Sequence, residues 1–350
     1  MEEDSYQGRK FIPKELKDCP ECGKPRIDEL IRHTQLNASQ TCDYLEWIPF
    51  EKFEMVKYIG SGGFGSVYSA LWMEGPRWNW DDGAQKWARA GPMTVALKRL
   101  DNSQKISSSF INQIKTYHKC LQSAPLAETF GITKDPTSNY MIVMKYYENG
   151  NLYQYLDRSN GILSWRDMID ILQGVARGLE RIHIEGKIHR NLHGGNLLIE
   201  DEEISTEACI SDVGLYGPCY YHENKNSGQR PWYDRAHDHY LAKSICDGER
   251  LEIPDDTPKF HAELMQQCWD NEPGNRPTAS YLYKKLNWIN LIRDNPNPFD
   301  DNYYISEEKR FKMASQFPTI YTHPEIHPEA HFTSRPLYFP EFQTQHIIHR

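Results

Sequence analysis

The sequence predicts an α+β fold in which strands dominate the first half of the chain and helices dominate the second half. The predicted strands carry alternating or continuous apolar residues and cover residues 67–72, 94–98 and 139–144. The clearest predicted helix covers residues 164–184, with apolar side chains along one face. Ser164 and Asp167 have the spacing of a capping box at its start. We therefore expect a strand-rich lobe followed by a mainly helical lobe.

The composition favours a globular protein without a nucleic-acid partner. A chain of 350 residues with 39% hydrophobic residues can bury one sizeable core or two lobes of one. The net charge of −9 offers no basic surface for nucleic acid or for an anionic membrane. We find no apolar run of membrane-spanning length and no signal-peptide pattern. We therefore expect a cytoplasmic protein whose eight cysteines are reduced thiols.

Residues 1–49 are predicted to form a polar N-terminal segment with one closely spaced pair of cysteines. Cys19 and Cys22 have the spacing of half a tetrahedral zinc site. Only His33 and Cys42 follow nearby, so a surface loop with free thiols is the preferred interpretation and a zinc site is the alternative. A short helix is also expected in this segment, at residues 27–36.

Three glycines between two predicted strands are followed by a lysine on the next strand. Gly60, Gly62 and Gly65 form the pattern G-x-G-x-x-G-x-V, which ends at Val67. Lys98 ends the pattern V-A-x-K. Glycines of this kind are a weak signal alone, because a hairpin turn also uses them and a dinucleotide fingerprint would need a following helix. The combination with the lysine is far more specific.

Two polar clusters lie between residues 188 and 214. The first is His-Arg-Asn-Leu-His-Gly-Gly-Asn, which includes Asn191 and Asn196, and the second is Asp-Val-Gly, which begins at Asp212. With the glycine and lysine patterns, these clusters resemble the catalytic loop and the D-F-G motif of protein kinases. Over about residues 53–290 the chain resembles a protein kinase. A large fungal group of tyrosine-kinase-like proteins is similar in three further features, namely a cysteine pair before the domain, the insertion Trp-Asn-Trp-Asp-Asp at residues 78–82 and the tail Ile-His-Pro-Glu-Ala-His-Phe-Thr-Ser-Arg-Pro at residues 326–336.

The resemblance implies a bilobal protein kinase fold with ATP and Mg²⁺ in the cleft between the lobes. The glycine loop would cover the phosphates, Lys98 would reach the α- and β-phosphates, and Asn196 and Asp212 would hold the metal. The residues expected around the adenine ring are Val67, Ala96, Met144, Tyr147 and Leu198. Ordinary core packing explains the apolar members of this set equally well.

Two carboxylates of the kinase pattern are amides in this chain. Asn191 stands at the position of the catalytic base, where an amide positions a hydroxyl but does not accept its proton. Gln113, on a helix expected over residues 108–121, stands where a glutamate would pair with Lys98. Because phosphoryl transfer depends more on metal and positioning than on the base, we expect a weakened site rather than a dead one.

The resemblance is interrupted after Asp212. The A-P-E motif and the long helix that follows it in kinases are missing, and a later helix is expected to begin at residue 231. Against the family pattern, about forty residues are lost. Arg276, in the element C-W-x-x-x-P-x-x-R-P, therefore lacks the glutamate with which the family pairs it. We expect this arginine to move to solvent or to find another carboxylate, because an unpaired buried charge is costly.

These patterns divide the chain into the N-terminal segment 1–49, a kinase-like domain over residues 50–292 and a tail over residues 293–350. The domain would comprise a small lobe, 53–147, and an incomplete large lobe, 148–292. The tail is rich in proline and histidine and is expected to be extended apart from one helical turn. A metal site formed by its histidines is the less favoured alternative.

The sequence therefore predicts a kinase homologue that binds ATP and acts in signalling, with phosphate transfer to protein weak or lost. An active protein kinase that uses Mg²⁺ and ATP is one alternative. A scaffold that works without nucleotide is another. The expected partners are protein substrates or other kinases.

Overall fold

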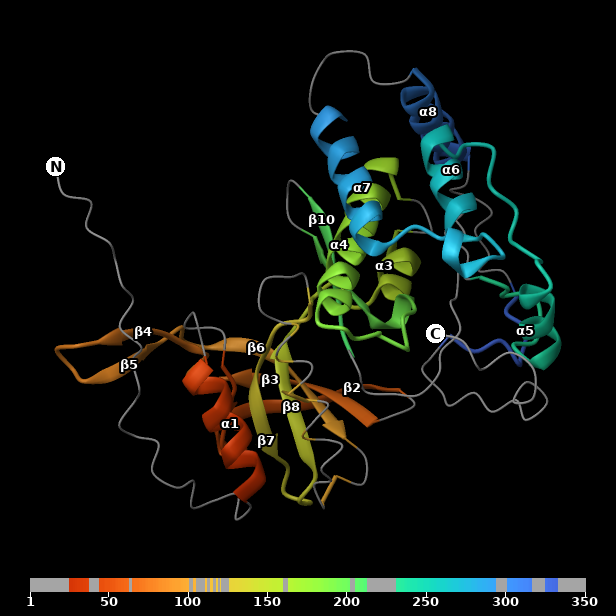
Figure 1. The fold of residues 1–350 in the computed structure, drawn as a ribbon. Coiled ribbons are helices and arrows are strands. Elements are labelled where there is room, and N and C mark those ends of the chain that lie inside the picture. The colour runs from red at the N-terminus through yellow and green to blue at the C-terminus, as the bar shows by residue number, and fades with distance from the viewer. Residues whose placement is uncertain are drawn as a thin grey trace, which may run out of the picture. The chain divides into compact units, whose positions relative to one another are not determined.

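The computed structural model of the chain separates into two compact units. The first is rich in strands and the second is mainly helical, which confirms the predicted α+β division (Figure 1). The structure describes residues 25–37, 44–62, 65–100, 126–159, 163–201, 205–212, 231–293, 301–316 and 325–332, together with single positions between 103 and 120.

The first unit is built on a six-stranded sheet with the order β1-β7-β8-β6-β3-β2. The predicted strands are confirmed as parts of β3, β6 and β8. β1 pairs with β7 in parallel, whereas the pairs β3–β6, β6–β8 and β8–β7 are antiparallel. The strands of the sheet are β1 (Glu46–Trp47), β2 (Phe53–Gly62), β3 (Gly65–Trp72), β6 (Met93–Leu100), β7 (Thr129–Lys134) and β8 (Tyr140–Lys145). A 3-10 turn, η1 (Phe50–Lys52), precedes β2.

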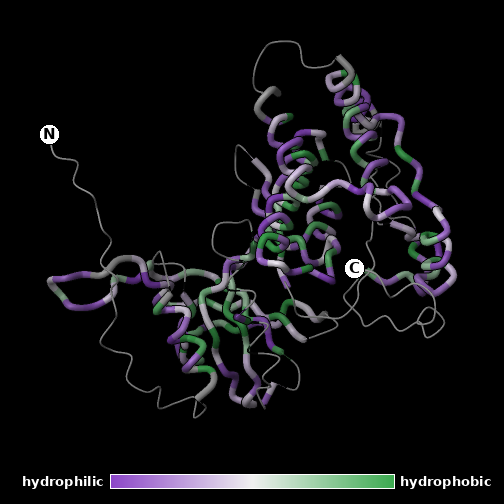
Figure 2. The backbone as a smooth tube through the Cα atoms, viewed as in Figure 1, coloured by the Kyte–Doolittle hydropathy of each residue, from purple (hydrophilic) through white to green (hydrophobic). Residues whose placement is uncertain are grey.

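The alternation of β6 places a core on one face of this sheet. Val95 and Leu97 are fully buried and pack with Val143 of β8 and Trp72 of β3. Side chains alternate between the faces of a strand, so Ala96 and Lys98 lie on the opposite face from this core. Figure 2 shows hydrophobic residues gathered along these strands. Burial of the apolar face sets the register that also positions the predicted site residues.

A helix from the N-terminal segment is part of the same unit. α1 (Pro25–Asn37) buries Ile27 and Leu30 completely in a cluster that also contains Ile132 and Tyr140 (Figure 1). The predicted helix at residues 27–36 is thereby confirmed. The helix expected over residues 108–121 is helical at the described positions from 111 to 120.

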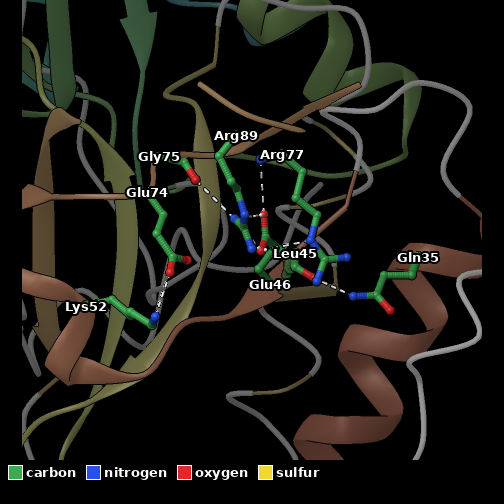
Figure 3. A network of polar contacts seen from close by, with 8 residues as sticks. All are labelled: Gln35, Leu45, Glu46, Lys52, Glu74, Gly75, Arg77 and Arg89. Atoms are coloured by element: carbon green, nitrogen blue, oxygen red, sulfur yellow. Dashed lines mark hydrogen bonds and ion pairs between the residues drawn. The ribbon is translucent and has the colours of Figure 1, made fainter. Parts of the chain in front are cut away.

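The insertion after β3 forms a hairpin of β4 (Arg77–Asp81) and β5 (Lys86–Arg89). Its two ends are held by Glu46 of β1, whose carboxylate lies 3.3 Å from Arg77 Nε and 3.0 Å from Arg89 Nη1 (Figure 3). Arg89 also donates to the carbonyl of Gly75 across 3.0 Å. Because Glu46 is buried, these two cations offset the cost of removing its charge from water.

The second unit is organised around the long helix α4 (Trp165–Ile184). The predicted capping box is confirmed, since Ser164 Oγ accepts the N–H of Asp167 and the Asp167 carboxylate accepts the N–H of Ser164. A Cβ on Gly174 would lie 2.7 Å from the carbonyl oxygen of Ala208, so this glycine allows α4 to approach β10. The other elements are α3 (Leu152–Arg158), α5 (His239–Cys246), α6 (Lys259–Cys268) and α7 (Ala279–Arg293), the turns η2 (Gly194–Asn196) and η3 (Pro273–Asn275), and a sheet of β9 (Leu197–Asp201) and β10 (Thr206–Ile210).

The helical turn expected in the tail, at residues 307–313, is confirmed as part of the helix α8 (Asp301–Gln316), and the expectation of an extended chain is wrong for the rest of residues 301–316. Glu307 of α8 accepts the backbone N–H of Trp165, at the start of α4, across 2.7 Å. Arg310 forms a buried ion pair of 2.8 Å with Asp256 and lies over the Trp165 ring. These contacts with distant residues supply the stability that a polar sixteen-residue helix lacks by itself.

Two expectations for the region after Asp212 have different outcomes. The helix expected from residue 231 begins only at His239, where the Asp238 carboxylate accepts the N–H of Leu241 and caps the helix. Arg276 is exposed and donates from Nε to the carbonyl of Asp270 across 2.8 Å, which confirms that it faces solvent.

Among the residues that the structure describes, no helix combines the length and the apolar character needed to cross a membrane.

Candidate functional site

The glycine-rich stretch links β2 to β3. Gly60 and Gly62 lie at the end of β2, and Gly65 is the first residue of β3. Gly65 has a φ of +153°, and a Cβ there would lie 1.9 Å from the carbonyl oxygen of Arg99. Only glycine fits this close approach to β6. A Cβ on Gly60 would meet nothing within 4 Å, so packing among the described residues does not require glycine at that position.

Four of the predicted nucleotide contacts share one face of the first unit's sheet. Val67 lies directly opposite Lys98, and Ala96 lies directly opposite Met144. Paired residues of antiparallel strands point to the same side, as do residues two apart such as Ala96 and Lys98. Met144 is buried and the other three are partly buried. An apolar surface next to one ammonium group suits a flat ring that carries phosphates.

Tyr147 and Leu198, the other predicted adenine contacts, lie in the second unit. The carbonyl of Tyr147 accepts the N–H of Gly150 across 2.9 Å, and the carbonyl of Gly150 accepts the N–H of Ile199 across 2.9 Å. These two hydrogen bonds connect the segment after β8 to β9. The structure therefore brings the segment of Tyr147 next to the strand that contains Leu198.

His189 joins the two polar clusters of the second unit. Its Nδ1 accepts the backbone N–H of Asn191 across 3.1 Å, and its Nε2 lies 2.7 Å from the backbone oxygen of Ser211. Because Nδ1 accepts, Nε2 carries the proton and donates to Ser211. Burial lowers the pKa of His189 below its ordinary value, against a smaller raising effect of the bond to Ser211. The imidazole is therefore neutral near pH 7 and holds one tautomer.

The backbone holds the two predicted metal ligands close to each other. The carbonyl oxygen of Asn196 accepts both the N–H of Ser211, across 2.8 Å, and its Oγ, across 3.1 Å. Ser211 directly precedes Asp212, so these bonds fix the backbone of Asp212 beside that of Asn196. Both side chains are buried, at 5% exposure for Asn196 and 8% for Asp212.

The orientation of the Asn196 amide follows from one further hydrogen bond. Its Nδ2 donates to the backbone carbonyl of Asn191 across 2.9 Å. The opposite atom of the amide, Oδ1, is therefore the one that would face a cation. An amide oxygen and a carboxylate are the hard oxygen ligands that Mg²⁺ prefers, so the chemistry of Asn196 and Asp212 fits this metal.

Two of the six non-glycine residues that have a positive φ in the described part of the chain lie in these two loops. Arg190 has a φ of +66° and Asp212 a φ of +62°, in the left-handed region that side chains rarely adopt. Each such residue costs about 1–3 kcal/mol and persists only where the surroundings hold it. The hydrogen bonds of His189 and Ser211 supply that restraint.

Some predicted site residues fall where the structure gives no description. Gln113 lies outside the described residues, as do Cys19, Cys22 and Cys42 of the zinc hypothesis. Within the described part of the chain, no group of three or more His, Cys, Asp or Glu side chains could hold a metal ion. Asn196 and Asp212 are a pair that includes an amide, so they fall outside this kind of cluster.

Four residues around the loop were not predicted as site residues. His189 and Ser211 position Asn191, Asn196 and Asp212, although only His189 carried a signal, as the first letter of the H-R-N motif. The other two are Tyr153 of α3 and His193, whose rings are stacked at 16° with centroids 6.4 Å apart. Nothing in the sequence connects Tyr153 with the loop, because the contact is purely tertiary.

Comparison with known proteins relates the sequence of this chain to one family. The family model "Protein tyrosine and serine/threonine kinase" matches residues 53–232 and 216–286, more than half of the chain. Tyrosine-protein kinase TXK of Homo sapiens is 24% identical over 292 residues, and that of Mus musculus is 24% identical over 322 residues. These alignments cover 73% and 76% of this chain but 51% and 57% of the relatives. The chain thus spans about half the length of the curated relatives it matches.

Proposed function

Because the chain belongs to the protein tyrosine and serine/threonine kinase family, we propose that it binds ATP with Mg²⁺ and that its transfer of phosphate to protein is weak or lost. The proposal rests on the two polar clusters of the second unit, which hydrogen bonds of His189 and Ser211 hold together. Asn196 and Asp212 are buried, oriented oxygen ligands on a restrained backbone, whereas Asn191 occupies the position of the base.

Nucleotide binding is supported in the first unit by the shared face of Val67, Ala96, Lys98 and Met144. The three apolar residues would contact the adenine ring, and Lys98 would contact the α- and β-phosphates. Gly60 adds to this, since an open position that needs no glycine for packing suits a backbone that covers phosphate oxygens. Tyr147 and Leu198, the other two residues predicted to contact adenine, belong to the second unit.

Metal binding is supported by the donor set of the second unit. Asn196 Oδ1 and the Asp212 carboxylate would hold Mg²⁺, which when bound neutralises charge on the β- and γ-phosphates. His189 connects the two loops through its hydrogen bond to Ser211, which directly precedes Asp212.

Weak transfer follows from the chemistry of Asn191. The backbone of this residue is held by His189 at its N–H and by Asn196 at its carbonyl, so the amide can orient an acceptor hydroxyl. It cannot take up the proton, and a positioned base contributes about a hundredfold to ten-thousandfold. The family model matches in two pieces that overlap at residues 216–232, which supports a shortened activation segment. The chain would act in signalling in the cytoplasm, with protein substrates or other kinases as partners.

The test combines ATP binding with phosphate transfer to a generic peptide. We expect the natural chain to bind ATP and to turn over at least about a hundredfold below the usual 1–100 per second. Asn191→Asp together with Gln113→Glu should retain binding and still not reach ordinary rates, because the acceptor must be held in line. Ordinary turnover by the natural chain would favour an active kinase. Absence of ATP binding would favour a scaffold instead.

A further inference from the structure

A short segment near the C-terminus of the chain is paired with the stretch before α5. The N–H of His327 donates to the carbonyl of Tyr233 across 2.8 Å, and the N–H of His237 donates to the carbonyl of Glu329 across 3.0 Å. The two backbones thus exchange hydrogen bonds in both directions, on either side of a turn that the N–H of Ala330 closes on the carbonyl of His327 across 2.9 Å. Residues 325–332 are therefore docked, which corrects the expectation of an extended free tail.

The side chain of His237 extends this pairing. Its Nδ1 accepts the N–H of His331 across 3.2 Å, and its Nε2 lies 3.1 Å from the carbonyl oxygen of Trp232. His237 is 7% exposed. One buried imidazole thus bridges its own loop and residues 325–332 at the point where the segment reaches Phe332.

Phe332 brings the segment to the catalytic loop. Its ring lies edge-on to His237, with centroids 5.0 Å apart, and edge-on to Tyr153, with centroids 6.0 Å apart. Tyr153 in turn stacks on His193 of the loop. The carbonyl oxygen of Phe332 lies 3.6 Å from the point that a Cβ on Gly195 would occupy. Residue 195 directly precedes the predicted metal ligand Asn196.

Two glycines of the loop make room for this arrangement. A Cβ on Gly194 would lie 2.6 Å from the Tyr153 ring, and a Cβ on Gly195 would lie 2.7 Å from the His193 ring. Real Cβ atoms do not approach so closely, so the run His-Gly-Gly is what allows aromatic rings to lie flat on the loop. This gives a physical reason for the two adjacent glycines of the loop.

We propose that Tyr153, His193, Gly195 and His237 form a peptide-binding surface beside the catalytic loop, and that its occupant is the chain's own segment 325–332, anchored by Phe332. Most of the segment is exposed, and only His327, Ala330 and Phe332 are partly buried. An occupant held by two backbone–backbone hydrogen bonds, one hydrogen bond to His237 and one aromatic anchor is displaceable. The surface therefore accepts a peptide with an aromatic residue, and the segment competes with any acceptor for it.

Hydrogen exchange on the full chain tests the docking without nucleotide, so its outcome is independent of ATP binding. The amides of His327, Ala330 and His331 should exchange at least about tenfold more slowly than in a free peptide. Phe332→Ala should remove this protection. Phe311→Ala, which truncates an exposed ring of α8, should leave it intact. Free-peptide exchange rates at these amides in the natural chain would overturn the proposal.

A peptide with the sequence of residues 325–332 tests the surface itself. It should bind the Phe332→Ala chain at least about tenfold more tightly than the natural chain, in which the surface is occupied. The same peptide with alanine in place of its phenylalanine should not bind, and His193→Ala in the Phe332→Ala chain should weaken binding of the unmodified peptide. Equal binding to the natural and Phe332→Ala chains, or no binding to either, would contradict the assignment.

Discussion

Asn196 donates its side-chain Nδ2 to the backbone carbonyl of Asn191 across 2.9 Å, so the last residue of the loop holds the residue that is predicted to stand at the position of the catalytic base. The backbone N–H of Asn191 is held as well, by His189. The position of Asn191 is therefore set by backbone contacts and does not depend on a carboxylate there. A change of chemistry at this site can leave the loop and its predicted metal ligands in place.

We predict different effects of alanine substitution at Gly60 and Gly65, because the surroundings of the two glycines differ. Gly65→Ala should lower the melting temperature of the free chain, since its φ of +153° and the 1.9 Å approach to Arg99 leave no room for a Cβ. Gly60→Ala should leave the melting temperature unchanged but reduce the shift caused by ATP. Thermal unfolding with and without ATP measures both. Equal losses of stability in the two variants would show that Gly60 has only a packing role.

A second prediction concerns pH and the buried His261. Burial lowers the pKa of this imidazole from 6.5 to about 4. Below pH 6.5 the unfolded chain takes up a proton that the folded chain does not, so the free energy of unfolding should fall as the pH falls from 6.5 to about 4. The full window corresponds to about 3 kcal/mol. Denaturant titrations of the natural chain and of His261→Phe, which keeps a ring against Trp165, measure this slope.

The variant should lose this part of the slope, since phenylalanine does not titrate. His33→Gln, at an exposed position of α1, serves as the control and should keep the slope of the natural chain. The same pH dependence in His261→Phe and in the natural chain would mean that His261 titrates alike in the folded and unfolded states.

The third prediction tests how α8 is attached to the second unit. Arg310 and Asp256 are 8% and 3% exposed and lie 2.8 Å apart. Arg310→Met should destabilise the chain by about 3–5 kcal/mol, because it leaves a buried carboxylate without its partner. Chemical denaturation provides the measurement, and Arg310→Met with Asp256→Leu should recover much of the loss. Lys312→Met, which breaks an exposed pair with Glu308, should leave the midpoint unchanged.

If α8 were not attached in this way, Arg310→Met would be no more harmful than Lys312→Met. That result would remove the reason for counting residues 301–316 as part of the second unit.

The strands, the long helix and the site motifs could be predicted because their signals are local. The alternation from Thr94 to Lys98 requires one buried face, and Ser164 and Asp167 cap α4 through contacts only three residues apart. The glycine, lysine and H-R-N patterns place the predicted site residues at fixed spacings along these elements. Such information is contained in short stretches of sequence.

The attachment of the C-terminal residues could not be predicted, because its causes are distant in sequence. Arg310 pairs with Asp256, which is 54 positions away in the sequence. Glu307 accepts the N–H of Trp165, which is 142 positions away. Phe332 packs against Tyr153, which lies 179 positions earlier in the chain. The composition of residues 293–350 suggested an extended chain, and tertiary partners overrode that local preference.

Calorimetric titration of ATP with and without Mg²⁺ measures whether the chain has a metal-assisted nucleotide site. The natural chain should bind at least about tenfold more tightly with the metal, a difference of about 1.4 kcal/mol. Asp212→Ala should remove the dependence on metal, Lys98→Met should abolish binding, and Asp255→Ala, at an exposed carboxylate, should behave like the natural chain. Equal affinity with and without Mg²⁺, or no binding of ATP by the natural chain, would contradict the account.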